Sequence, residues 1–146
     1  IVGLRIARAA TREELAEAAA GLTSLVRTLQ ATGAHMRHLG EMVSALNGRI
    51  LSRLYDLTLP PELRQRCCLL VLGSEGRSEQ ILRTDQDNAL VLGEGVADVD
   101  VAGPAQALSD GLAALGYPPC PGKVMVSNPA WRGSVREWLE RIERLK

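Results

Sequence analysis

Aromatic residues are almost absent from this sequence of 146 residues: they make up 3% of it, and phenylalanine does not occur. Apolar residues still reach 46%, so the hydrophobic core has to be built from Leu, Val and Ala. The 17 basic side chains are balanced by 17 acidic ones, and a chain without net charge gives no reason to expect nucleic acid as a partner. No apolar run approaches the roughly 20 residues of a membrane span, and no signal peptide is recognisable, so we expect no membrane partner.

Cysteine and histidine are also scarce. The cysteines Cys67, Cys68 and Cys120 are odd in number and lack the spacing of a disulfide framework, which favours a reducing compartment, the cytoplasm. Cys67 and Cys68 are neighbours at the start of an apolar run, so we interpret them as small buried hydrophobic residues rather than a redox pair. His35 and His38 are close in sequence but have no further ligands around them, a pattern that disfavours a zinc site.

The chain begins at Ile1 rather than Met and ends in the charged run EWLERIERLK, so we interpret it as a segment of a longer protein. Its character changes at two consecutive prolines, which end a helical region. We expect three parts: a linker from a preceding domain over residues 1–10, a helical arm over 11–58 and a core over 62–146.

Residues 11–58 predict an antiparallel pair of helices. Thr11 and Glu14 form a capping box, in which the hydroxyl accepts from a backbone N–H and the carboxylate reaches back. Thr32-Gly33 breaks the helical pattern before a second helix. The apolar residues at helical spacing are Leu15, Ala18, Leu22, Leu25, Val26 and Leu29, and then Met36, Leu39, Val43, Leu46, Ile50 and Leu54. Such an arm is either a structural support or a partner-binding surface, for instance for a second copy in a homodimer.

The core is expected to be of the α+β (α/β) class, a small mixed β-sheet flanked by helices. Two apolar runs have strand length, and their continuous apolar character is typical of strands buried on both faces. The last helix carries an apolar stripe of Trp131, Val135, Trp138 and Ile142. The predicted elements are strands at 67–73, 87–93 and 123–127, a loop at 93–103, and helices at 104–116 and 129–145.

Asp85 and Asp87 stand directly before the second apolar run. Side chains alternate along a strand, so both carboxylates should point to the same side, with Cα atoms roughly 6.5–7 Å apart. Two unpaired carboxylates this close repel each other and lose hydration, and a divalent cation removes both costs. Mg²⁺ suits them best because it takes oxygen ligands and completes its shell with water and substrate phosphates. The alternative is an ordinary strand–turn–strand with solvated aspartates.

A phosphate-binding turn is expected upstream of the aspartates. Gly73-Ser74 ends the first apolar run, where glycine lets a ligand approach the backbone. Ser74 can cap a short helix in the residues that follow, and the free N–H groups of a helix start bind anions. Arg77 adds a planar cation for phosphate oxygens. Turn and aspartates together indicate nucleoside triphosphate chemistry.

The stretch GSEGRSEQILRTDQDNAL resembles the signature of the nucleotidyltransferase superfamily that includes DNA polymerase beta, in which an Asp–x–Asp pair follows a Gly–Ser turn. It is most similar to nucleotidyltransferases related to the N-terminal part of protein-PII uridylyltransferase. In bacterial signalling proteins that domain commonly follows CBS or cyclic-nucleotide-binding domains. The helical pair and the later stretch GYPPCPGKVMVSNPAWRGSVREW fit the same resemblance.

The resemblance implies a role for each motif residue. Gly73 and Ser74 would hold the nucleoside triphosphate, and Asp85 and Asp87 would bind two catalytic Mg²⁺ ions. An acceptor hydroxyl would attack the α-phosphate, with pyrophosphate leaving. In uridylyltransferases the acceptor is a tyrosine of a small regulatory protein.

Two departures from the family pattern bear on activity. Gln86 stands between the aspartates where a hydrophobic residue is usual, although the narrower subgroup shares this substitution. Active members also have a third carboxylate on a later strand, whereas the expected strand at 123–128 has no acid. Of the remaining acids, Glu94, Asp98 and Asp100 belong to the loop and Asp110 to a helix. Either the third acid comes from that loop or from outside the segment, or water or Asn128 replaces it, or transfer activity is lost.

Asn88 is a candidate nucleotide-binding residue and Arg132 a candidate pocket residue, and for both a structural role such as capping or a surface ion pair is an equal alternative. Three functions stay open. One is Mg²⁺-dependent uridylyl or adenylyl transfer from a nucleoside triphosphate to a PII-like regulatory protein. Another is a catalytically silent module that binds nucleotide and metal, and the last is an interaction domain whose arm dimerises.

Overall fold

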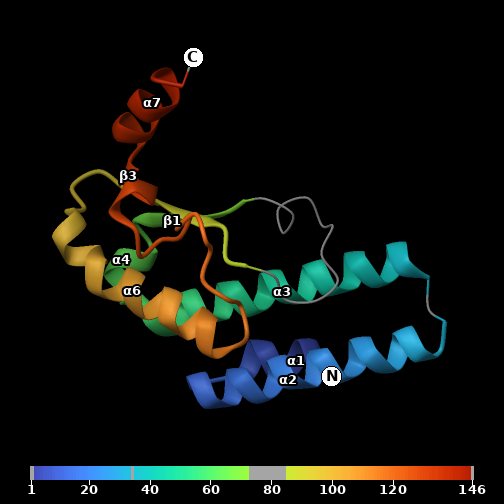
Figure 1. Cartoon of the computed structure of the whole chain (residues 1–146). Helices are drawn as coiled ribbons and strands as arrows, with labels where there is room; N and C mark the ends of the chain where they lie inside the picture. Colours follow the sequence, from blue (N-terminus) through green and yellow to red (C-terminus); the bar gives the residue numbers. More distant parts are fainter. Residues whose placement is uncertain (1, 34, 73–84, 146) are drawn as a thin grey trace.

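The periodic patterns of the chain form helices packed beside a small mixed β-sheet, which is the predicted α+β class (Figure 1). The structure, a computed structural model, describes residues 2–33, 35–72 and 85–145. No helix in these residues is long and apolar enough to cross a membrane. The elements in chain order are α1 (Val2–Arg8), α2 (Arg12–Ala31), α3 (Met36–Thr58), α4 (Pro61–Arg64), β1 (Cys67–Val71), β2 (Asn88–Leu92), α6 (Asp98–Ala114), η1 (Pro129–Trp131), β3 (Arg132–Ser134) and α7 (Val135–Glu143).

The predicted helical pair is confirmed as α2 and α3, which run antiparallel (Figure 1). The backbone N–H of Glu14 donates to the Thr11 hydroxyl over 3.1 Å, and the Glu14 carboxylate accepts from the N–H of Ala10 over 2.7 Å. The Thr11 half of the predicted capping box is confirmed, whereas the Glu14 carboxylate reaches one residue beyond Thr11, to Ala10. The buried members of the two apolar stripes are Leu15, Ala18, Leu22 and Val26 in α2, and Leu39, Val43, Ile50 and Leu54 in α3.

Residues 1–10, expected as a linker, contain the helix α1. This helix packs against both α2 and α3, and its Ile6 side chain is fully buried in the main core. The guanidinium Nε of Arg53 on α3 donates to the carbonyl oxygen of Ala9 over 2.7 Å, which fixes the end of the segment. This segment therefore contributes to the same core as the helical pair.

The sheet has the strand order β1-β2-β3, with β2 in the centre. Strands β1 and β2 pair antiparallel, with Val71 opposite Asn88, whereas β2 and β3 pair parallel, with Leu90 opposite Arg132. Four of the five residues of β2 are buried, as expected for a strand covered on both faces. The central strand thus positions the candidate site, because Asp85 and Asp87 directly precede it.

Strand β1 departs from the prediction of burial on both faces. It lies at an edge of the described sheet, and its residues alternate in exposure, with Cys68 and Leu70 exposed. Cys67 and Leu69 are half-buried against the core. The prediction of two buried cysteines was therefore wrong for Cys68, because only one face of this strand packs on the helices.

The strand predicted at 123–127 does not form. Val124 accepts a backbone bond from the N–H of Asn88 over 3.0 Å, as a strand partner would. The N–H of Val126, however, donates to the Asn88 side chain over 2.8 Å, and Lys123 has a left-handed φ of 57°. A side chain and a turn-type backbone therefore replace the regular ladder.

The third strand lies instead inside the helix that we predicted at 129–145. Asn128 caps the short 3₁₀ turn η1, and β3 follows before α7 begins. Ser134 and Glu137 form a complete capping box that starts α7 at Val135, and this signal was present in the sequence. The prediction merged three short elements because both tryptophans fit one helical stripe.

Helix α7 uses only part of that stripe. Its Trp138 indole N–H donates to the carbonyl oxygen of Leu90 on β2 over 3.1 Å, and the Trp138 ring lies 5.8 Å from the ring of Trp131. Val135 and Ile142 are instead 59% and 52% exposed. The helix projects from the sheet (Figure 1) and contacts β2 and β3.

Helix α6 begins earlier than predicted. Residues 98–103, expected as a loop, form its first turns, and Pro104 lies inside the helix rather than at its start. Asp98 and Asp100 in the first turn favour this start, because acidic side chains interact well with the N-terminal end of the helix dipole. Further along, Gly111 faces Leu54 of α3, whereas Asp98 at the start of the helix pairs with Arg132 of β3, so that α6 contacts both the helical pair and the sheet.

Gly93 gives a direct test of this fold. A Cβ at Gly93 would overlap the backbone carbonyl oxygen of Arg66, with which its own N–H bonds over 2.6 Å. We expect Gly93→Ala to lower the unfolding free energy by about 1–3 kcal/mol, the range for overpacking. The control Gly48→Ala, in a helix with open space around the new Cβ, should raise it by about 0.5–1 kcal/mol. Urea denaturation measures both, and equal changes would contradict the assignment.

Candidate functional site

Only some of the predicted site residues lie in the part of the chain that the structure describes. Gly73, Ser74 and Arg77, predicted to hold phosphate, lie outside the described residues. Asp85 and Asp87, predicted to bind metal, are described and precede the central strand β2. The structure therefore defines the surroundings of the two carboxylates.

Gln86 anchors the candidate site in the core and is only 4% exposed. Its side-chain amide nitrogen donates to the carbonyl oxygen of Ser109 on α6 over 3.0 Å and to that of Tyr117 over 3.2 Å. Its backbone N–H donates to the carbonyl oxygen of Pro118 over 2.9 Å. A residue at which the family pattern usually has a hydrophobic side chain thus faces inward and forms directional bonds.

The two aspartates keep contact with solvent on either side of Gln86. Asp85 is exposed and Asp87 is half-buried. This alternation is what a locally extended backbone produces when the middle residue points into the core. Both aspartates border a small cavity of about 10 Å³, enough for roughly one water molecule and too small for a nucleotide. A nucleotide would therefore have to bind on the outer side of the carboxylates.

Cys120 is a neighbour of the candidate site that no sequence pattern indicated. Its thiol donates to a carboxylate oxygen of Asp87 over a sulfur–oxygen distance of 3.4 Å. The residues around it run alongside the candidate site, since Pro118 bonds to Gln86 and Val124 bonds to Asn88. We call residues 117–126 the flanking segment. Only the tertiary fold reveals this neighbour, because no local signal in the sequence places it there.

Asn88 is bonded into this framework and also borders the small cavity beside the aspartates. Its side chain is buried, and its Oδ1 accepts from the N–H of Val126 over 2.8 Å. Its backbone N–H donates to Val124 on the same segment. Of the two roles that the sequence left open for Asn88, the structural one is what these contacts describe.

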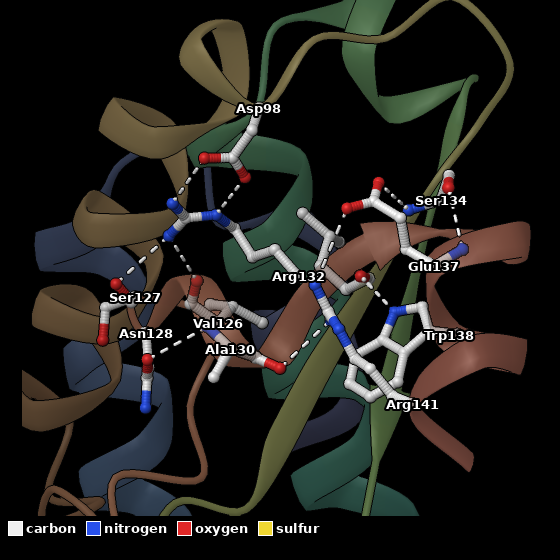
Figure 2. Close-up of polar contacts among 11 residues, drawn as sticks. Asp98, Val126, Ser127, Asn128, Ala130, Arg132, Ser134, Glu137, Trp138 and Arg141 are labelled. Carbon is white, nitrogen blue, oxygen red and sulfur yellow. Dashed lines mark hydrogen bonds and ion pairs between the residues drawn. The ribbon is translucent and has the colours of Figure 1, made fainter. Parts of the chain in front are cut away.

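Arg132 is likewise engaged in a structural ion pair. Arg132 is only 4% exposed, and its guanidinium donates twice to the Asp98 carboxylate, over 2.8 and 3.0 Å (Figure 2). It also donates to the carbonyl oxygens of Val126 and Ser127 over 3.0 and 3.1 Å. The hydrogen bond from Arg132 holds the pKa of Asp98 below its usual value. Arg132 therefore joins the start of α6 to the end of the flanking segment.

No third carboxylate joins the two aspartates within the described residues, where no group of three or more His, Cys, Asp or Glu side chains could hold a metal ion. Asp98 is engaged by Arg132. Glu94, Asp100 and Asp110 are all exposed, and the Asp110 carboxylate accepts from the Gln106 amide over 2.9 Å. The described part of the site thus offers two acids.

A small mixed sheet with two aspartates one residue apart at the start of its central strand is an arrangement that fits a nucleotidyltransferase domain. The comparison with family models agrees with this class. The family described as "Putative nucleotidyltransferase DUF294" matches residues 20–145, and the chain belongs to this family. No curated protein and no solved structure matches the chain. The resemblance identified from the motif is confirmed at the level of this family.

The buried amide of Gln86 can be tested by Gln86→Met, which keeps an unbranched side chain of similar length. We expect the unfolding free energy to fall by about 1–3 kcal/mol, because the carbonyls of Ser109 and Tyr117 lose a buried donor. Asp85→Asn serves as the control on an exposed neighbour and should stay within about 0.5 kcal/mol of the wild type. Equal stability of all three proteins in urea would show that the amide does not anchor the backbone.

The Asp98–Arg132 pair predicts a pH-dependent stability. Because the folded-state pKa of Asp98 is lowered, its contribution is present above about pH 4 and is lost as the pH falls further. At pH 7, Asp98→Asn should lower the unfolding free energy by about 1–2 kcal/mol, less than for a fully buried pair because the Asp98 side chain is 52% exposed.

Asp100→Asn is the matched control, since Asp100 lies in the same first turn of α6 and is exposed. Asp100→Asn should lower the unfolding free energy only by the amount that comes from losing a negative charge near the N-terminal end of the helix dipole. The difference between wild type and Asp98→Asn, measured by urea denaturation, should shrink between pH 7 and pH 3. A difference that is constant over this range would contradict the ion-pair assignment.

Proposed function

We propose that this domain transfers a nucleotidyl group from a nucleoside triphosphate to a hydroxyl group of a regulatory protein, in a Mg²⁺-dependent reaction. Family membership supports nucleotidyl transfer. The single structural observation that carries the proposal is the anchoring of Gln86 in the core, which leaves Asp85 and Asp87 in contact with solvent on either side. The protein acceptor is proposed from the resemblance to protein-PII uridylyltransferase.

The donor set fits Mg²⁺. Asp85 is exposed and Asp87 half-buried, so both can offer carboxylate oxygens without disturbing the core. Mg²⁺ is usually held by one or two carboxylates and completes its shell with water and substrate phosphates, so two acids suffice for binding. When bound there, Mg²⁺ would neutralise phosphate charge and lower the pKa of a coordinated hydroxyl.

The contribution of the chain itself is positioning. The acceptor oxygen forms a bond to the α-phosphorus while the bond to pyrophosphate breaks, and the rate of such an in-line displacement depends on alignment and on fixed charge. Gln86 fixes the backbone that carries the two aspartates. Cys120 donates to one oxygen of Asp87 and thereby restricts the orientation of that carboxylate.

A second candidate function is a catalytically silent module that binds nucleotide and metal. It is favoured by one observation, the presence of only two acids at the site within residues 2–33, 35–72 and 85–145. Such a module would bind nucleotide through the same aspartates and would pass the signal on through a change in its contacts.

A transfer assay distinguishes the two functions. The protein is incubated with Mg²⁺, with each labelled nucleoside triphosphate in turn, and with a purified PII-type acceptor. We expect label on the acceptor with at least one nucleotide, and a loss of about 100-fold or more in Asp85→Asn and Asp87→Asn, the scale for losing a charge-stabilising group. Asp110→Asn, an exposed acid on α6, is the control and should transfer as the wild type does.

Nucleotide binding is measured on the same proteins by calorimetry. Binding that requires Mg²⁺ and both aspartates, without any transfer, would establish the silent module instead of the enzyme. Absence of Mg²⁺-dependent binding for every nucleotide would contradict both candidate functions.

A further inference from the structure

A surface groove of about 420 Å³ lies directly beside the candidate site. Its lining comes from residues 119–129, and we call it the 119–129 groove. Pro119, Pro121 and Pro129 provide stiff apolar walls, and Met125 adds a flexible one. A volume of this size lies within the roughly 300–1,000 Å³ of small-molecule sites.

The groove is continuous with the proposed metal ligands. Cys120 lines the groove, and its thiol contacts the Asp87 carboxylate over 3.4 Å. A ligand in the groove would therefore lie next to the carboxylate that is proposed to hold Mg²⁺. The larger hollow, of about 490 Å³, is formed by α1 and α2, and neither aspartate lines it.

The groove is held in shape by its own hydrogen bonds. The N–H of Lys123 donates to the carbonyl oxygen of Cys120 over 2.9 Å, and the Asn128 amide donates to the carbonyl oxygen of Lys123 over 2.9 Å. The N–H of Asn128 also donates to the carbonyl oxygen of Met125 over 2.9 Å. A preformed groove binds a ligand without first losing conformational entropy.

Lys123 gives the groove its charge and an uncommon backbone. It is the charged residue of the lining, which contains no carboxylate. Its φ of 57° lies in the left-handed region, where a side chain is disfavoured and glycine is preferred. A lysine kept in such a conformation points to a role for its ammonium group, because strained residues gather at ligand sites.

From these observations we propose that the 119–129 groove binds the nucleoside part of the nucleoside triphosphate, with Lys123 contacting the phosphate chain where it approaches Asp87. This proposal rests on the proposed function of the aspartates. The base would pack against proline and methionine side chains, which replace the aromatic platform that the chain lacks here. The single positive charge complements the anionic nucleotide.

The thiol of Cys120 provides a reporter within the groove. Tryptic cleavage separates it, on the peptide 84–123, from Cys67 and Cys68 on the peptide 67–77, which serve as internal controls. With Mg²⁺ and a nucleoside triphosphate at ten times its Kd, alkylation of Cys120 by iodoacetamide should slow about tenfold, as occupancy predicts. Alkylation of the control cysteines should not change.

Inorganic tripolyphosphate with Mg²⁺, which lacks the nucleoside, is the matched ligand. At ten times its own Kd it should slow the alkylation of Cys120 less than the nucleoside triphosphate does, because it reaches Lys123 and Asp87 but leaves the proline and methionine walls of the groove uncovered. Equal protection by tripolyphosphate would overturn the assignment of the nucleoside to this groove.

The variant Lys123→Gly removes the ammonium group and also relieves the left-handed backbone, so its thermal midpoint should be unchanged or higher. Its nucleotide affinity should fall about tenfold, the scale for one charge-assisted hydrogen bond, and Lys123→Arg should bind close to the wild type. Nucleotide binding that needs Asp85 and Asp87 but ignores Lys123 and leaves Cys120 unprotected would overturn the groove proposal alone. Absence of any nucleotide binding would overturn it together with the proposed function.

Discussion

The side-chain amide of Gln86 donates to two carbonyl oxygens, those of Ser109 and Tyr117, while only 4% of the residue is exposed. A hydrophobic residue at this position would also face inward, but its packing would have no direction, whereas the amide fixes the backbone against α6 and against the flanking segment. Because β2 begins at Asn88, this anchor sets the point at which the two aspartates leave the core. The orientation of the candidate site, the register of the flanking segment and the position of the groove all depend on it.

The ion pair between Asp98 and Arg132 changes how the acids of this chain are understood. From the sequence, Asp98 was one of several acids in an expected loop that could have completed a metal site. In the structure it lies at the start of a helix and neutralises a buried guanidinium. Using Asp98 as a metal ligand would take the carboxylate partner away from the buried Arg132 guanidinium, which is destabilising. Asp98 therefore stabilises the fold, whereas Asp85 and Asp87 are in contact with solvent beside β2.

The sequence predicts the features that follow from local rules. The helical pair follows from the spacing of Leu15, Leu22 and Leu54 and their neighbours, and the outward-facing aspartates follow from alternation around Gln86. Prediction from the sequence fails where a residue distant in the chain determines the local structure. The segment around Val124 is apolar enough for a strand, but the Asn88 side chain occupies part of its ladder. Strand β3 is too short to show a period, and the contact between Cys120 and Asp87 joins residues far apart in the chain.

The tryptophan side of α7 has a consequence for how the protein can be observed. The chain has two tryptophans, and both lie at its C-terminal end, where their rings are 5.8 Å apart and Trp138 bonds to the central strand. Tryptophan fluorescence is therefore a local signal. It reports on whether the last helix is docked on the sheet, and it carries no direct information about the helical arm at the other end of the fold.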